Sequence, residues 1–148
     1  MRHVEVLASV AGRPAGELFP LLCDMRQYPN YSDRVVSLEI EPGANGSMVS
    51  KWVVKLGPGT ATWTQRDDFE PETRTIRFQG LAGDIDSFTG AWTVRDNGAG
   101  SLLHFTCDFD IGLPGLGALI EPRIARLLSD NIRLIFNGMF GANLPPED

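Results

Sequence analysis

The sequence predicts an α+β fold in which a curved, seven-stranded antiparallel sheet wraps around a long C-terminal helix, with two short helices between the first and second strands. Apolar and polar residues alternate through short segments between residues 36 and 111, and glycine- and proline-rich turns separate these segments. From about residue 116 to 139, apolar residues instead recur at the spacing of an amphipathic helix. A helix that stands off the sheet would leave an internal apolar cavity.

Length and charge bound the class of protein. The 148 residues fit one domain, residues 1–148, with a frayed tail at 143–148. The chain has 13 lysines and arginines against 19 aspartates and glutamates, a net charge of −6, which argues against nucleic-acid binding and against docking on an anionic membrane. No apolar run approaches the ~20 residues of a membrane span, and the N-terminus does not resemble a signal peptide. We therefore expect a cytoplasmic protein, monomeric or homodimeric, without stable membrane insertion.

The two cysteines, Cys23 and Cys107, are far apart and belong to no metal-binding or redox motif, which indicates a reducing compartment. We expect no metal and no organic cofactor. Ser50 and Cys107 are predicted to face inward as packing residues rather than as nucleophiles. His104 is predicted to face outward and His3 lies near the start of the chain, so neither is a candidate base.

The N-terminal segment predicts one strand and two short helices. Residues 3–10 form the first strand, because alternate residues are apolar. Pro14 suits the first turn of a helix, and leucines and a phenylalanine follow at helical spacing, although Pro20 should limit or kink this helix. A second short helix or turn is expected between residues 23 and 31. Tyr28 and Tyr31 in this region are candidates to line the mouth of a cavity.

The six further strands place unusual aromatic bulk on one face of the sheet. The aromatic residues predicted to face inward are Trp52, Trp63, Phe69, Phe78, Phe88, Trp92, Phe105 and Phe109. Two interpretations remain open for them: a large aromatic core, or an apolar pocket lined by aromatic rings.

Polar residues on the same face favour a pocket. Gln65 and Asp67 are predicted to face inward between Trp63 and Phe69. A buried carboxylate is costly unless it is paired or solvated, and its pKa should rise, which suits a general acid or base. The alternative is a one-residue bulge, which would turn Asp67 outward and bring Arg66 or Asp68 inward.

The C-terminal helix carries a second polar anomaly. Its predicted apolar stripe contains Leu116, Ile120, Ile124, Leu127, Ile135 and Gly138, and Asn131 lies near the middle of it. A buried amide needs a partner, which is either a ligand or facing strand group, or a backbone carbonyl of the core. Pro122 is expected to bend the helix or to mark its first turn. The glycine-rich residues 112–117 before it are expected to form a flexible connection, a candidate gate to the cavity.

Several segments resemble one protein family. They are Leu18-Phe19, Asp24-Met25-Arg26-Gln27-Tyr28-Pro29-Asn30-Tyr31, Gly90-Ala91-Trp92-Thr93-Val94, Asp108-Phe109-Asp110-Ile111 and the closing helix. Together they resemble the START-like (SRPBCC) superfamily, in particular its polyketide cyclase/dehydrase and coenzyme Q-binding-protein family. The resemblance implies a helix-grip fold with a deep apolar cavity, and a hydrophobic ligand such as a polyketide, a quinone or a lipid.

The resemblance also implies a function. A polyketide cyclase/aromatase-like protein would bind a polyketide intermediate and promote aldol closure and dehydration in natural-product biosynthesis, with an acyl carrier protein as a candidate partner. The alternative is a non-catalytic carrier or sequestering protein for a quinone, lipid or hydrophobic metabolite. In the cyclases an arginine on the fourth strand is a key pocket residue, whereas Asp67, next to Arg66, occupies that position here, which departs from the pattern of the cyclases.

Under the enzyme hypothesis each candidate residue has a role. Asp67 would be the acid or base, while Gln65 and Asn131 would orient the substrate carbonyl. The residues expected to contact the ligand are Tyr28, Tyr31, Trp52, Trp63, Arg66, Phe69, Phe78, Phe88, Trp92, Phe105 and Ile135.

Overall fold

The computed structural model describes residues 1–112 and 117–144, with side chains described from residue 119 onward in the second range. The elements follow in the order β1 (Arg2–Val10), α1 (Ala15–Cys23), the 3-10 turn η1 (Met25–Gln27), α2 (Tyr28–Tyr31), β2 (Val35–Pro42), the 3-10 turn η2 (Ala44–Gly46), β3 (Met48–Leu56), β4 (Gly59–Glu70), β5 (Thr75–Gly83), β6 (Ser87–Asn97), β7 (Gly100–Asp110) and α3 (Gly117–Phe140).

The seven strands form one antiparallel sheet with the order β1-β7-β6-β5-β4-β3-β2. The strands from β2 to β7 are neighbours in sequence order, as alternating segments joined by tight turns predict. β1 joins the free edge of β7, so the first and last strands lie side by side. The predicted sheet and its covering helix are therefore confirmed.

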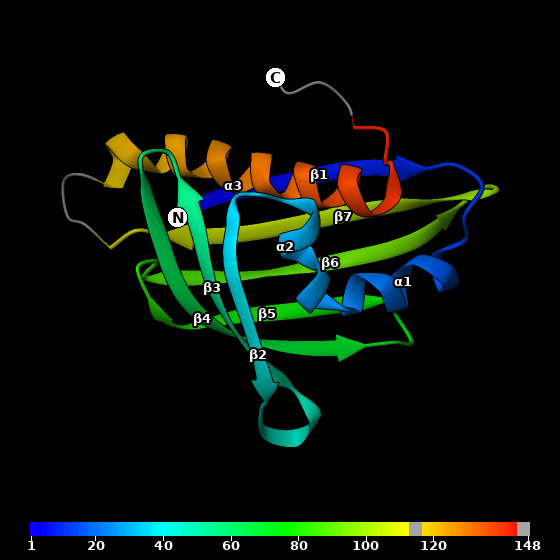
Figure 1. Cartoon of the computed structure of the whole chain (residues 1–148), viewed down its shortest axis with the longest axis horizontal. Coiled ribbons are helices and arrows are strands. Elements are labelled where there is room, and N and C mark those ends of the chain that lie inside the picture. The colour runs from blue at the N-terminus through cyan, green and yellow to red at the C-terminus, as the bar shows by residue number, and fades with distance from the viewer. Residues whose placement is uncertain (113–116, 145–148) are drawn as a thin grey trace.

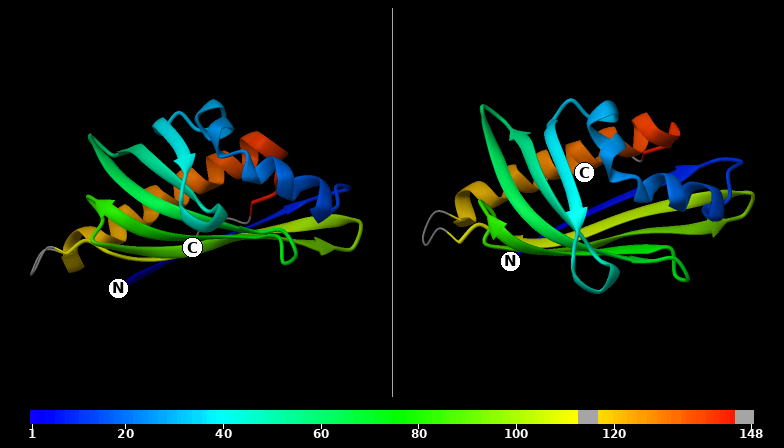
Figure 2. Two further views of the ribbon diagram at one scale, coloured as in Figure 1. Left: turned by 90° about the horizontal axis from the view of Figure 1, so that it is seen from below. Right: turned by 60° about the horizontal axis from the view of Figure 1, so that its bottom comes forward.

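The sheet curves around α3, which lies on its concave side (Figure 1 and Figure 2). α3 runs along β1 and also contacts β7 and β3, while α2 contacts both α3 and β2, and α1 packs against β6 and β7. The inward-facing side chains of the strands and the buried face of α3 form one apolar core. No helix of the described residues is both long and apolar enough to cross a membrane.

Prolines lie inside two of the helices. Pro20 lies within α1, which continues to Cys23, and Pro122 lies within α3. Both prolines are exposed. A proline removes one helical hydrogen bond, and on the solvent side water can satisfy the carbonyl left unpaired. Pro20, which was expected to limit or kink this helix, does not end it at once, because α1 runs three residues past it.

The buried face of α3 differs from the predicted stripe. Its buried apolar residues are Leu128, Ile132, Ile135, Phe136 and Phe140. Ile120 is exposed, and Gly138 lies against α2, where a Cβ atom would approach the Tyr31 Cβ to 2.8 Å. The predicted stripe was too narrow because the sheet covers one side of α3 and α2 covers another. Leu116 lies outside the described residues.

The C-terminal segment is ordered further than predicted. Asn143 exchanges two backbone hydrogen bonds with Ser9 of β1, at 3.0 and 2.8 Å, so the chain is held to the sheet through residue 143. The rest of the predicted tail, from residue 145, lies outside the described residues. So do residues 113–116, which make up most of the predicted gate.

Candidate ligand-binding site

Seven aromatic side chains form a closed ring inside the fold. Each contacts the next with ring centroids 4.8 to 5.9 Å apart, in the order Tyr28, Trp52, Trp63, Phe88, Phe78, Phe105, Trp92 and back to Tyr28. The strands β3 to β7 supply six members, because the pleat places alternate residues on the concave face. Tyr28 of α2 closes the ring, and its hydroxyl donates to the Leu22 carbonyl at 2.5 Å.

The aromatic ring surrounds a small internal cavity. The residues that line it are Trp52, Trp63, Gln65, Phe78, Phe88, Trp92, Phe105, Leu128, Asn131 and Ile132. Its volume is about 20 Å³, which is room for about one water molecule. A ligand of several rings would have to separate α3 from the sheet in order to enter.

A buried hydrogen-bond network lies beside the cavity. The carboxylate of Asp67 accepts a hydrogen bond from Ser50 Oγ at 2.5 Å and another from Gln65 Nε2 at 2.7 Å. Each of these two donors in turn accepts an indole N–H: Trp52 donates to Ser50 Oγ, and Trp63 donates to Gln65 Oε1, both at 2.9 Å. Two tryptophans of the ring are thereby held in place by a single carboxylate.

Asp67 faces inward, so the bulge that would turn it outward is not in β4. The register shift between β4 and β5 instead leaves Leu81 of β5 unpaired, between Gly80 and Ala82. Burial raises the pKa of Asp67 to about 6, although its hydrogen bonds from Ser50 and Gln65 oppose that rise. Asp67 does not line the cavity, however, whereas Gln65 does. Asp67 is therefore separated from the cavity by Gln65, to which it is hydrogen-bonded.

Asn131 brings a second amide to the cavity wall. Its side-chain carbonyl accepts a hydrogen bond from the Ser32 hydroxyl at 2.6 Å, and both residues are buried. Neither alternative of the sequence analysis named this partner, which follows α2 rather than lying on a facing strand or on the core backbone. This bond fixes the orientation of the Asn131 amide, whose NH2 group has two hydrogens to donate.

Trp92 differs from the other two tryptophans. Its side chain is buried and lines the cavity, yet its indole Nε1 has no hydrogen-bond partner in the part of the chain that the structure describes. Its ring packs edge-on against Phe105 and Phe136 and tilts against Tyr28. A buried donor without an acceptor costs free energy, so a residue of the cavity lining carries an unused hydrogen-bond donor.

The structure separates the predicted contact residues into two groups. The cavity lining contains Trp52, Trp63, Phe78, Phe88, Trp92 and Phe105. The other five do not line it: Tyr28 belongs to the aromatic ring, Ile135 is buried in the core, Phe69 is half-buried near the end of β4, and Tyr31 and Arg66 are exposed.

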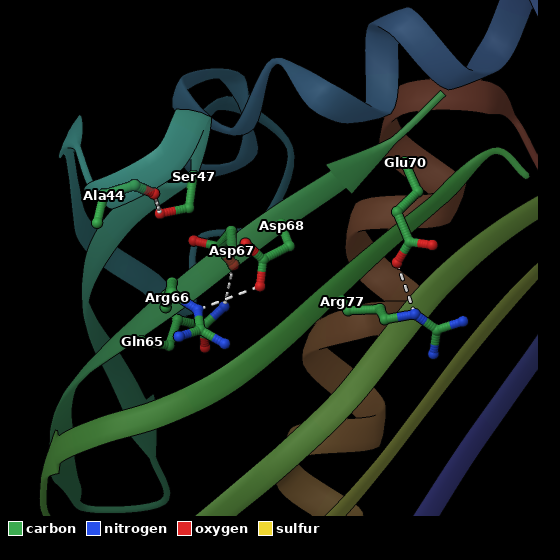
Figure 3. Close-up of polar contacts among 8 residues, drawn as sticks. All are labelled: Ala44, Ser47, Gln65, Arg66, Asp67, Asp68, Glu70 and Arg77. Carbon is green, nitrogen blue, oxygen red and sulfur yellow. Dashed lines mark hydrogen bonds and ion pairs between the residues drawn. The ribbon is translucent and has the colours of Figure 1, made fainter. Parts of the chain in front are cut away.

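Arg66 lies on the outer face of the sheet. Figure 3 shows that side chains of β4 alternate: Gln65 bonds to Asp67 on one face, while Arg66 pairs with Asp68 on the other, at 3.1 Å. A second outer-face ion pair joins Arg77 to Glu70 at 2.6 Å. Arg66 therefore does not supply the inward-facing arginine that the cyclases have.

The sequence predicted Ser50 only as a packing residue, whereas the structure places it in the Asp67 hydrogen-bond network. The sequence did not predict the parts played by Ser32, Leu128 and Ile132. Ser50 lies opposite Gln65 in the β3–β4 register, so the hairpin alone places a hydroxyl beside the amide. Ser32 is 99 residues away from Asn131 and carries no local signal. Leu128 and Ile132 follow helical spacing, but each lies one position after a residue of the predicted stripe.

A larger groove lies outside the cavity. Its volume is about 440 Å³, and α3, the β3–β4 turn and the segment before β6 form its walls. The lining residues are Leu56, Gly59, Thr60, Ala61, Asp84, Ile85, Ile111, Ile120, Arg123, Ile124 and Leu127. Ala61 and Leu127 are close neighbours in sequence of the cavity residues Trp63 and Leu128, so this groove is a candidate entrance.

Cysteine and metal chemistry have little support in the described residues. Burial raises the pKa of the Cys107 thiol to about 12 and that of the Cys23 thiol to about 11, so both stay protonated and unreactive at neutral pH. Within residues 1–112 and 117–144, no three acidic, histidine or cysteine side chains gather as metal ligands.

A curved antiparallel sheet closed over a long helix, with an aromatic cavity between them, defines a START-like helix-grip protein. The chain belongs to the family described as polyketide cyclase / dehydrase and lipid transport, whose model matches residues 11–135. A comparison with curated protein sequences finds no match.

Solved structures share the fold at low sequence identity. A protein from Thermus thermophilus is 21% identical, with a TM-score of 0.85 and coverage of 95% of each chain. The ZhuI aromatase/cyclase from a Streptomyces species is 23% identical, with a TM-score of 0.83, and the match covers 95% of this chain and 92% of the other. A START superfamily protein from Mycobacterium smegmatis is 14% identical, with a TM-score of 0.76, and the match covers 94% of this chain and 97% of the other.

Proposed function

We propose that this protein binds a planar, conjugated hydrophobic molecule inside the aromatic ring. The observation that carries this proposal is the ring itself, in which six aromatic side chains line the cavity and Tyr28 joins Trp52 to Trp92. Aromatic faces and edges suit a flat π-system better than a saturated chain, which gains only its buried area. A polyketide intermediate or a quinone therefore fits better than a saturated lipid.

The amides of Gln65 and Asn131 would orient such a ligand. Both line a cavity that is otherwise apolar, and a few polar groups in an apolar pocket fix the orientation of a ligand. Ligand entry would require α3 to move away from the sheet, since the closed cavity holds about one water molecule. The outer groove of about 440 Å³ beside the N-terminal half of α3 would give a ligand a route from the surface to the cavity.

A second candidate function is cyclisation of a polyketide by aldol closure and dehydration. The specific observation in its favour is that Gln65, which is hydrogen-bonded to an Asp67 with a pKa of about 6, lines the same cavity as Asn131. In this hypothesis the cavity folds the chain and the amides hold its carbonyls, so orientation supplies much of the rate. Family membership and the fold shared with an aromatase/cyclase support it.

In that second hypothesis we assign Asp67 as a positioning residue. It would become the acid or base itself only if Gln65 swung aside when a substrate entered. Delivery of the substrate by an acyl carrier protein stays a prediction.

Calorimetric titration tests the binding proposal. The probes are 9-fluorenone, which is planar and conjugated, and palmitate, which has a saturated chain. We expect 9-fluorenone to bind with a stoichiometry near one and palmitate to bind at least about tenfold more weakly. Preferential binding of palmitate would show a lipid carrier and would overturn the choice of a conjugated ligand.

Mass spectrometry tests the cyclisation hypothesis separately. The protein would be incubated with an enzymatically generated poly-β-ketone, beside an Asp67→Asn variant and a control without protein. If wild type alone changes the ring pattern or removes water, the protein is an enzyme. If it retains the polyketide while the products match the control, it is a carrier.

A further inference from the structure

We propose that the unpaired indole N–H of Trp92 is the binding site for a carbonyl oxygen of the ligand, so the protein selects conjugated ketones and quinones over hydrocarbons of the same shape. This inference rests on the proposed function, because it names the ligand chemistry of the same cavity.

The contrast between the three cavity tryptophans carries the inference. Trp52 and Trp63 each donate to a buried side-chain oxygen, at 2.9 Å, and those oxygens belong to the Asp67 network. Trp92 has equal burial, at 2% exposed, but its Nε1 has no acceptor in the described part of the chain. Buried donors are almost always paired in folded proteins, so an acceptor is missing at one defined place.

The unmet hydrogen-bonding need of the site is for an acceptor atom. The Asn131 oxygen already accepts from Ser32 and the Gln65 oxygen already accepts from Trp63, although each could accept one further bond. The Trp92 indole N–H, by contrast, has no partner within the described residues, so a ligand acceptor removes a cost that the protein alone leaves in place. A carbonyl oxygen accepts such a bond and brings no donor of its own into these apolar surroundings.

The aromatic surroundings set the rest of the ligand. The Trp92 ring packs against Tyr28, Phe105 and Phe136, so the indole that would bind the carbonyl is itself surrounded by aromatic rings. In such dry surroundings a single hydrogen bond discriminates strongly, since without it the indole stays unpaired. A carbonyl conjugated to a flat ring system satisfies both the N–H and the rings.

A pair of probes that differ only in the carbonyl tests the inference. 9-Fluorenone and fluorene share one planar skeleton, in which the ketone replaces a CH2 group. We expect wild type to bind 9-fluorenone about tenfold more tightly than fluorene, and we expect Trp92→Phe to lower this preference to about twofold or less. The matched control is Phe109→Leu, which changes a buried aromatic side chain of β7 that does not line the cavity, and it should keep the preference.

NMR of the wild-type protein provides a readout that does not depend on a variant folding. The three indole N–H signals should respond differently to 9-fluorenone: the Trp92 proton should move downfield as it gains an acceptor, by more than the Trp52 and Trp63 protons. Fluorene should leave the Trp92 proton without this downfield shift.

The outcomes separate this inference from the proposed function. If both probes bind with equal affinity and the Trp92 proton does not move downfield, the carbonyl site is overturned while binding of a planar ligand stands. If neither probe binds, the carbonyl site and the proposed function are both overturned. A preference for 9-fluorenone that survives Trp92→Phe would assign the carbonyl to another donor and overturn the role of Trp92.

Discussion

Gln65 lies between Asp67 and the cavity: its amide nitrogen donates to Asp67 Oδ1 over 2.7 Å, and its side chain forms part of the cavity wall. Its oxygen accepts the Trp63 indole N–H at the same time. These two bonds hold both ends of the amide, so the Asp67 carboxylate helps to set the orientation of the Gln65 side chain. A change at Asp67 would therefore reach the cavity without any contact between Asp67 and the ligand.

Gln65→Leu should destabilise the protein by about 2–3 kcal/mol, because it leaves the buried Trp63 N–H unpaired and removes a donor from the Asp67 carboxylate. It should also raise the pKa of Asp67 above its value of about 6. Urea denaturation and an NMR titration of the carboxyl group measure the two effects. Gln79→Leu, on the exposed face of β5, is the matched control and should change stability by less than about 0.5 kcal/mol. Equal effects of the two substitutions would contradict the network.

Asp67 should make the protein less stable as pH rises from about 4 to 6. Burial raises the pKa of Asp67 from 3.8 to about 6, so the folded state holds this proton more tightly than the unfolded state. The contribution is fully present below the unfolded pKa and is lost as pH passes the folded pKa. Its size is about 3 kcal/mol.

Denaturation of wild type and Asp67→Asn at pH 4 to 7 measures the contribution of Asp67 to the free energy of unfolding. The difference in unfolding free energy between the two proteins should change by about 3 kcal/mol across this range. Asp33→Asn, at an exposed position before β2, is the control and should retain the slope of wild type. A pH dependence that persists unchanged in Asp67→Asn would show that Asp67 is not the group responsible.

Leu128→Ala should lower the stability of the protein and raise its affinity for 9-fluorenone. Leu128 is buried on α3 and lines the cavity, so truncation should cost about 2–4 kcal/mol of unfolding free energy. The added space should make binding of 9-fluorenone tighter and faster, because less opening of the fold is needed. Stopped-flow fluorescence gives the association rate, and Leu119→Ala, on the exposed side of α3, is the control. Slower association in Leu128→Ala would argue against entry between α3 and the sheet.

Gly138→Ala should destabilise the contact between α3 and α2. A Cβ atom at residue 138 would lie 2.8 Å from the Tyr31 Cβ and 3.1 Å from the Tyr31 carbonyl oxygen. Overpacking of this kind costs about 1–3 kcal/mol, more than the ~1 kcal/mol that alanine gains inside a helix. Thermal denaturation compares it with Gly59→Ala, where the new Cβ meets nothing within 4 Å. A stabilised Gly138→Ala protein would mean that α2 does not pack tightly here.

Periodicity predicted the fold because each strand has one buried face, and the same alternation placed Asp67 and all three tryptophans inward. It could not predict how closely α3 packs on the sheet, so the small volume of the cavity was not foreseen. The Ser32–Asn131 bond joins residues from distant parts of the chain, and only the folded structure reveals it. Arg66 faces outward because its neighbours Gln65 and Asp67 face inward, which the alternation of β4 already implied.

The most direct test of the account is to locate a bound ligand with methyl NMR. Leu128 and Ile132 line the aromatic cavity, whereas Ile120 and Leu127 line the outer groove. The account predicts that 9-fluorenone shifts the methyl signals of Leu128 and Ile132 most strongly and gives intermolecular NOEs to them. NOEs confined to Ile120 and Leu127, with the cavity methyl groups unchanged, would contradict the claim that the aromatic ring is the ligand-binding site.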